Sequence, residues 1–194
     1  NLIIFIDGPK NKKDVINQEY IKYMISTSSL KEVKTIYKKK NLGLSKSLLD
    51  GINYLSKRYE KFIILEDDCI PYKNFLEYFN YCFRKFEKDN HVNSICSFQF
   101  NEMSEQNTSE LSIMKLPHFI PWGWGTWSAK WKNFKKNKIK DFKNYPSFMK
   151  KLNNNKYRFN KKNNIWTLDY VLYQYHYSKK SIYPNISLLK NIGF

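Results

Sequence analysis

The stretch from Lys61 to Pro71 constrains the fold of this chain more than any other segment. Four apolar residues, Phe62 to Leu65, run directly into three consecutive carboxylates, Glu66 to Asp68. A short apolar run bounded by a breaker is typical of a strand covered on both faces, as in a parallel sheet flanked by helices. Ligands bind outside the carboxyl ends of such strands, so we expect the carboxylates at a binding edge.

Three neighbouring carboxylates repel one another at neutral pH, which is costly unless a cation or hydrogen-bond donors neutralise them. Such hard oxygen ligands suit Mg²⁺ or Mn²⁺, and Mg²⁺ is usually held by one or two carboxylates together with substrate phosphates. The segment therefore predicts a divalent-metal nucleotide site. Two alternatives remain open: a solvated acidic loop, or capping residues for the helix expected after Pro71.

Strands and helices alternate along the sequence. We expect strands at Leu2–Ile6, Val33–Tyr37, Lys61–Leu65, Val92–Phe100 and Ser181–Pro184, and helices at Asp14–Thr27, Ser45–Arg58, Phe75–Phe86 and within Ile165–Tyr177. This alternation predicts an α/β fold with a mostly parallel, doubly wound central sheet. At 194 residues the chain is expected to form one domain, 1–194, with a Lys/Asn-rich insertion at about 132–164.

The net charge of +17 comes almost entirely from lysine. Such a charge attracts polyanions, meaning nucleic acid, an anionic membrane surface or phosphorylated substrates. The three cysteines, Cys69, Cys82 and Cys96, lack metal-ligand spacing and favour a reducing compartment. No apolar run reaches 18 residues. We therefore expect a cytoplasmic protein that can associate with the inner face of the membrane.

Two polar segments are further candidates for an anion or nucleotide site. Asp7 and Gly8 follow the first expected strand, and Asp7 shares an edge with the acidic segment if the two strands are parallel. The turn from Asn41 leads into a helix whose free N–H groups, with Lys46 nearby, can receive an anion. An ordinary helix cap is the alternative for this turn.

Tryptophans alternate with glycines at Trp122, Gly123, Trp124, Gly125 and Trp127. Glycine lets backbone approach a ligand closely, and indoles stack on the apolar faces of sugar rings. We expect this segment to face a ligand, with a core position as the alternative.

The acid of the segment Trp166–Tyr170 is Asp169, in the first turn of an expected helix. Asp169 either complements the helix dipole or serves as a general base.

Six motifs in this order resemble nucleotide-sugar glycosyltransferases of the GT-A fold, similar to the family 2 enzymes of bacterial surface-polysaccharide synthesis. They are IFIDGPK at 4–10, NLGLSKSLLDGI at 41–52, ILEDDCIP at 64–71, PWGWGTW at 121–127, WTLDY at 166–170 and SIYPNISLLKNIGF at 181–194. The EDD also resembles that of the eukaryotic enzymes that add N-acetylglucosamine to N-glycans. The resemblance implies a hexosyltransferase that moves a sugar from a nucleotide-sugar donor to a glycan or lipid-linked acceptor, with no nucleic acid as partner.

The resemblance also implies roles for the acids and for the nucleotide-binding residues. Asp68 would bind Mn²⁺ or Mg²⁺ bridging the diphosphate, with Glu66 and Asp67 towards the ribose. Asp7, beside Gly8, would accept a hydrogen bond from the base, and the segment from Asn41 to Lys46 would approach the nucleotide.

On the acceptor side, the Trp-Gly segment would shape the pocket and Asp169 would deprotonate the acceptor hydroxyl. A carboxylate base opposite the leaving group gives inversion by single displacement, so inversion is a prediction conditional on Asp169.

The family's first strand precedes Leu2, and a Gly- and His-containing tail follows Phe194 in related sequences, so we expect a domain incomplete at both ends. Two other functions fit the residues by themselves. The acids suit a metal-dependent phosphoesterase or nuclease, and the lysines suit a non-catalytic module that binds polyanions.

Overall fold

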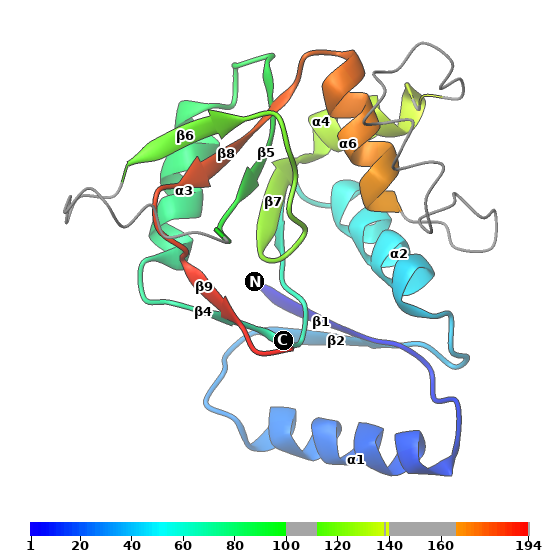
Figure 1. Ribbon diagram of the computed structural model, residues 1–194. Coiled ribbons are helices and arrows are strands. Elements are labelled where there is room, and N and C mark those ends of the chain that lie inside the picture. Colours follow the sequence, from blue (N-terminus) through cyan, green and yellow to red (C-terminus); the bar gives the residue numbers. More distant parts are fainter. Residues whose placement is uncertain (100–111, 138, 140–165, 194) are drawn as a thin grey trace. The chain divides into compact units, whose positions relative to one another are not determined.

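The computed structural model describes residues 1–99, 112–137, 139 and 166–193 (Figure 1). The chain forms two compact units, Asn1–Asn53 and Tyr54–Phe194, which we call unit 1 and unit 2. We expected a single domain, and we describe each unit by itself. No helix among the described residues is long and apolar enough to cross a membrane.

Unit 1 contains a parallel pair of strands joined by a helix. Strand β1 (Leu2–Ile6) pairs in parallel with β2 (Val33–Tyr37), and α1 (Lys12–Thr27) connects them. Asn11 caps α1, since its side chain accepts a hydrogen bond from the Asp14 N–H at 3.0 Å. The Asp14 side chain accepts a hydrogen bond from the Lys10 N–H at 2.9 Å, which satisfies a backbone donor just before the helix. Helix α2 (Leu44–Ser56) begins in unit 1 and runs into unit 2.

Unit 2 is built on a five-stranded mixed sheet with the order β3-β7-β5-β8-β6. The strands are β3 (Lys61–Ile64), β5 (Val92–Cys96), β6 (Ile113–Leu116), β7 (Trp124–Trp127) and β8 (Lys180–Pro184). Only the β5–β8 pair of this sheet is parallel, and its other three pairs are antiparallel. The predicted α/β class is confirmed, but the sheet is mixed where we expected it to be mostly parallel. Hydrophobic period identifies a strand without fixing the direction of its partner.

Helices cover both faces of this sheet (Figure 1). On one face lies α3 (Phe75–Lys85), whose Phe83 ring meets Trp127 of β7 edge to face at 5.3 Å. On the other lie α4 (Ser128–Lys136) and α6 (Trp166–His176), whose Trp131 and Trp166 surround Trp124. Each face of β7 therefore contributes one tryptophan to the core.

A separate pair of short strands lies beside the acidic segment. Strand β4 (Cys69–Pro71) pairs antiparallel with β9 (Leu189–Asn191), with Cys69 opposite Asn191. A proline is acceptable in this small sheet because it stands at the end of its strand. The chain thus turns sharply at Asp67 and Asp68 between β3 and β4.

Candidate functional site

The three acids form a corner between two strands of unit 2. Strand β3 ends at Ile64, and the Cys69 N–H donates to the Glu66 carbonyl oxygen at 3.1 Å to close the turn. Asp67 is exposed, while Glu66 and Asp68 are partly buried. We call Glu66, Asp67 and Asp68 the acidic corner. The prediction that an apolar strand delivers these acids together at its carboxyl end is confirmed.

The electrostatics of the acidic corner favour uptake of a positive charge. The pKa of Glu66 is raised, first by burial and then by repulsion from Asp68 and Asp67. Within the described part of unit 2, no lysine, arginine or histidine forms an ion pair with these carboxylates. A cation placed here would relieve a repulsion that the described chain leaves uncompensated.

The donor set fits a divalent cation that is shared with a substrate. Nowhere in the described ranges do three His, Cys, Asp or Glu side chains converge into a metal cage. A cation at the acidic corner would therefore need further ligands from a bound substrate, and Mg²⁺ is usually held by one or two carboxylates together with substrate phosphates. Hard oxygen donors at the corner suit Mg²⁺ or Mn²⁺. The thiol of Cys69 donates to Asp68 Oδ1 at 3.4 Å, and the Ile192 N–H donates to the Asp68 carbonyl at 2.8 Å.

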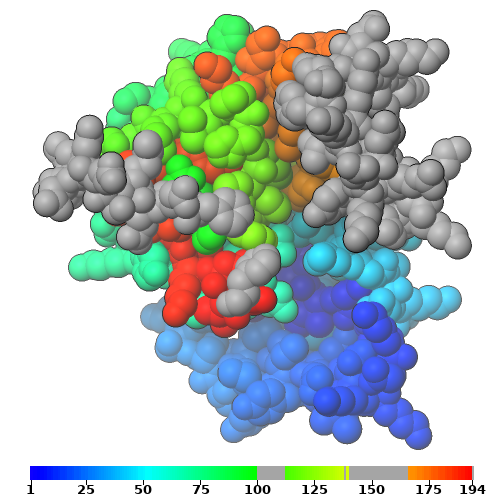
Figure 2. Space-filling model, viewed as in Figure 1, coloured from blue at the N-terminus to red at the C-terminus, as the bar shows by residue number. Residues whose placement is uncertain are grey.

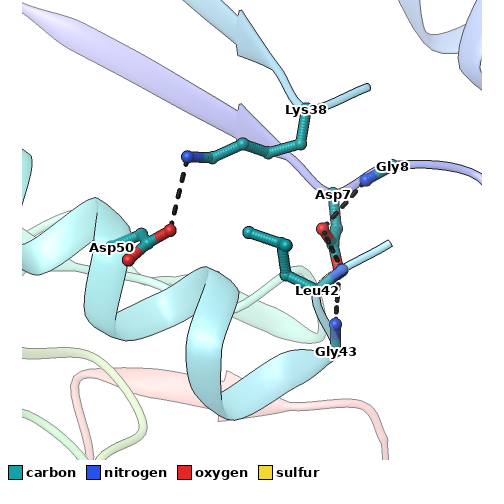
Figure 3. Close-up of polar contacts among 6 residues, drawn as sticks. All are labelled: Asp7, Gly8, Lys38, Leu42, Gly43 and Asp50. Carbon is teal, nitrogen blue, oxygen red and sulfur yellow. Dashed lines mark hydrogen bonds and ion pairs between the residues drawn. The ribbon is translucent and has the colours of Figure 1, made fainter. Parts of the chain in front are cut away.

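In unit 1 the Asp7 carboxylate binds the loop that precedes α2 (Figure 3). It accepts the Gly8 N–H at 2.9 Å, the Leu42 N–H at 3.0 and 3.1 Å, and the Gly43 N–H at 2.9 Å. The resemblance implied that Asp7 binds the nucleotide base. The structure shows that this carboxylate also accepts backbone N–H groups of its own chain, and its contact with the nucleotide base stays a prediction.

Gly8 and Asn41 complete this arrangement. A Cβ on Gly8 would lie 2.1 Å from the Lys40 carbonyl carbon and 2.5 Å from the Asn41 nitrogen, so only glycine fits. The Asn41 amide donates to the Gly8 carbonyl at 2.9 Å. The structure thus brings Asp7 and Gly8 together with Asn41, and the three residues fix the loop at 41–43.

Two charged residues accompany this loop on α2. Lys46 lies exposed in the first turn of the helix, where an anion can reach it. Further along, Asp50 forms an ion pair of 3.5 Å with Lys38 (Figure 3). The predicted location of Lys46 at a helix N-terminus is confirmed.

The Trp-Gly segment is mostly core. The Trp124 side chain is 0% exposed and Trp127 is 5% exposed, so the expectation that these indoles face a ligand is wrong. Trp122 is partly exposed and packs edge to face on Phe98 at 5.0 Å. Trp122 is therefore the residue of this segment that retains a surface for a ligand.

The two glycines of this segment also serve packing. A Cβ on Gly125 would lie 2.9 Å from the ring of Phe83 and 3.0 Å from that of Phe79, both on α3. Gly123 has a φ of 59°, and a Cβ there would lie 2.0 Å from Leu189. The close approach that glycine permits is thus to other parts of the core and not to a ligand.

Asp169 lies partly buried in the first turn of α6, between the buried residues Trp166 and Tyr170. Its predicted place at the start of an aromatic helix is confirmed.

Two neighbours of Asp68 were not predicted from the sequence. They are Asn191 and Gly193, which β9 brings against the acidic corner. Both lie in a motif that we noted at 181–194, but no local pattern pairs β9 with β4. Parts of the Lys/Asn-rich insertion, including residues 140–164, lie outside the described residues, whereas 132–136 belong to α4.

Comparison with known proteins gives one family. A family model described as "Glycosyl transferase family 2" matches residues 1–166, which covers most of the chain. No curated protein matches the chain.

Proposed function

The chain belongs to glycosyl transferase family 2, and from this premise we propose that it transfers a sugar, with the help of a divalent cation at the acidic corner, to a hydroxyl of a glycan or lipid-linked acceptor. The family makes the chain a glycosyltransferase with a nucleotide-sugar donor and an acceptor substrate. This enzyme class replaces the two alternatives, a phosphoesterase or nuclease and a non-catalytic polyanion-binding module.

The observation that carries the proposal is the uncompensated charge of the acidic corner. Burial and two neighbouring carboxylates raise the pKa of Glu66, and the described part of unit 2 supplies no basic partner. Proteins rarely hold such a cluster without a cation or donors to neutralise it. A divalent cation bound with a diphosphate supplies both the positive charge and the missing ligands.

Each residue of the corner has a distinct task in this proposal. Asp68 would hold Mn²⁺ or Mg²⁺ through its carboxylate, and Glu66 and Asp67 would lie on the ribose side of the donor. A cation held there would supply positive charge to the diphosphate leaving group.

Unit 1 contributes the loop at 41–43 and the exposed Lys46. Asp7 and Gly8 act as positioning residues, since they hold this loop through backbone contacts. Lys46, in the first turn of α2, offers a positive charge to a phosphate, and a helix N-terminus favours the same ligand. We propose that this surface approaches the nucleotide.

In this proposal Trp122 and Asp169 interact with the acceptor. The partly exposed indole of Trp122 can stack on a sugar ring. Asp169 acts as the base that takes the proton of the acceptor hydroxyl, which makes the transfer inverting. An Asp169→Asn enzyme that keeps the full transfer rate would remove Asp169 from this role.

The proposed setting is synthesis of a surface polysaccharide or glycoconjugate at the inner face of the membrane. The net charge of +17 supports attraction to an anionic membrane surface, where lipid-linked acceptors are found.

A thermal-shift screen tests the proposal. UDP, GDP, dTDP and ADP, with the corresponding nucleotide sugars, are added with Mn²⁺ or with EDTA. We expect a rise in melting temperature with one nucleotide only when Mn²⁺ is present, and its loss in Asp68→Ala. An equal shift in EDTA, or in Asp68→Ala, would contradict the metal-bridged site.

A further inference from the structure

The carboxylate of Asp68 lies directly against the backbone of Gly193. A Cβ built on Gly193 would be 2.5 Å from Asp68 Oδ2 and 3.3 Å from Asp68 Cβ. Real Cβ atoms do not approach an oxygen that closely, so Asp68 can occupy this position only because residue 193 has no side chain. The backbone of Gly193 is not in the left-handed region, so backbone conformation does not require glycine here.

Two hydrogen bonds hold the chain at Gly193, and a third closes the far end of the β4–β9 pair. The Ile192 N–H donates to the Asp68 carbonyl at 2.8 Å, and the Gly193 N–H donates to Asn191 Oδ1 at 2.8 Å. The Tyr72 N–H donates to the Leu188 carbonyl at 3.0 Å at the other end of the β4–β9 pair. The backbone of Gly193, beside the Asp68 carboxylate, is therefore fixed by strand pairing and by the Asn191 side chain.

Asn191 brings further polar atoms to the same spot. Its Oδ1 lies 3.3 Å from the Cβ position of Gly193, so it faces the same small space as Asp68 Oδ2. Its Nδ2 is buried and has no hydrogen-bond partner among the residues that the structure describes. An unpaired buried donor beside a carboxylate is costly unless a ligand completes it. The segment around β9, red in Figure 2, reaches the molecular surface, where a ligand can arrive.

We propose that Gly193, held by Asn191, is a positioning residue that sets where the Asp68 carboxylate presents its oxygens to the bound cation and diphosphate. This inference rests on the proposed function of Asp68. A side chain at position 193 would push Oδ2 aside. Since Oδ2 is the far end of a short rotatable side chain, the carboxylate would turn away and the fold would stay intact.

A substitution at Gly193 should therefore alter nucleotide binding without altering the stability of the fold. Gly193→Ala should leave the melting temperature of the ligand-free protein within about 2 °C of the wild type, since a surface-proximal change with a yielding neighbour costs little. It should weaken Mn²⁺-dependent nucleotide binding by about tenfold or more, as is typical when the orientation of a metal ligand is lost. Ile192→Ala is the matched control, because its side chain is 54% exposed and its backbone N–H is kept.

The experiment is calorimetric titration of UDP, GDP, dTDP and ADP in the presence of Mn²⁺, with wild type, Gly193→Ala, Ile192→Ala, Asp68→Asn and the double variant Gly193→Ala/Asp68→Asn. We expect Gly193→Ala to weaken binding in the wild-type background and to have no further effect in Asp68→Asn, since the two residues act through one carboxylate. Ile192→Ala should bind as the wild type does.

Three results would overturn the inference alone: unchanged nucleotide affinity in Gly193→Ala, an equal loss in both backgrounds, or unfolding of Gly193→Ala. The last would mean that Asp68 cannot yield. A wild-type protein that binds none of UDP, GDP, dTDP and ADP with Mn²⁺ would instead reject the proposed function, and this inference with it.

Discussion

Gly8 shows how a single residue can determine the structure of a site loop. Its missing Cβ lets the turn after β1 contact the backbone of Lys40 and Asn41 at distances that no side chain permits. Those contacts are to backbone atoms, which cannot rotate away as a side chain can. Gly8 therefore differs from Gly193, whose neighbour is the end of the Asp68 side chain.

Gly8→Ala should lower the free energy of unfolding by about 3 kcal/mol or more, because overpacking against backbone forces a chain shift. Gly51→Ala is the control in the same unit. Its Cβ would make ordinary contact with the Phe5 ring at 3.5 Å, and alanine in a helix should stabilise by about 0.5–1 kcal/mol. Urea unfolding, with hydrogen exchange of the β1 and β2 amides, measures both. Wild-type stability of Gly8→Ala would contradict the packing described here.

Lys130 joins α4 to the end of α3 through a single ammonium group. Its Nζ donates to the carbonyls of Phe86, Asp89 and Val92 at 2.9, 3.0 and 2.7 Å, and lies 3.8 Å from the centre of the Trp127 ring. Burial lowers the pKa of Lys130 from 10.5 to about 8, and the nearby Asp89 opposes that shift. Burial thus disfavours the charged form of Lys130 in the folded state, although three carbonyls accept hydrogen bonds from its ammonium group.

Lys130→Met should lower the free energy of unfolding by about 1–3 kcal/mol at pH 7.5, because it leaves carbonyls without donors. Between pH 8 and 10.5 the unfolded state binds the lysine proton more strongly than the folded state, so the contribution of Lys130 to stability rises with pH. Urea unfolding at pH 7.5 and 9.5 should therefore show a larger difference between wild type and variant at the higher pH. A difference independent of pH would contradict the lowered pKa.

At the scale of elements, a buried polar layer fixes α6 on the sheet. The Tyr170 hydroxyl accepts the Asn93 amide at 2.5 Å and donates to the Asn93 carbonyl at 3.2 Å. One turn later, the Gln174 amide donates to Ser94 Oγ at 3.1 Å and Ser181 Oγ at 3.0 Å. Directional bonds at two successive turns define the register of α6, and with it the position of Asp169.

Tyr170→Phe should cost about 1–3 kcal/mol, because it leaves a buried amide hydrogen of Asn93 without an acceptor. Tyr177→Phe, at a side chain 41% exposed, is the control and should change stability by less than about 0.5 kcal/mol. Chemical denaturation followed by tryptophan fluorescence measures both. Equal effects of the two substitutions would show that the polar layer does not fix α6.

The helices and strands could largely be predicted from the sequence, but the pairing of the strands could not. Local period predicted β1, β2, α2, α3 and β8 to within a few residues, because apolar spacing follows the geometry of each element. It could not predict that β7 lies between β3 and β5, nor that β9 pairs with β4, because such pairings join segments far apart in the chain. For that reason Trp124 and Trp127 were expected at a ligand, although the structure places them between helices and sheet.

Among the candidate site residues, those that form a local pattern could be predicted, and those that depend on distant segments could not. The acids at 66–68 could be predicted, because three carboxylates after an apolar strand are unusual in themselves. The hydrogen-bond partners of Asp7 and the contact of Gly193 with Asp68 could not be predicted, because each depends on the backbone of a segment distant in the chain.

At the scale of the whole molecule, the chain consists of two units with different structural content. Within unit 1, Asp7 and Gly8 hold the loop at 41–43, and unit 2 contains the acidic corner and α6. The family match at residues 1–166 extends over both. The central claim is that the acidic corner binds a divalent cation that in turn binds the donor diphosphate.

The most direct test is the rate at which the protein releases nucleoside diphosphate from a nucleotide sugar, measured with Mn²⁺ and after chelation with EDTA. We predict that release requires Mn²⁺ and falls by about a hundredfold or more in Asp68→Asn, since the loss of a charged ligand removes transition-state stabilisation. Glu77→Gln, on α3, serves as the charge-matched control and should keep the wild-type rate. Full activity in EDTA, or in Asp68→Asn, would show that no cation at the acidic corner takes part in the transfer.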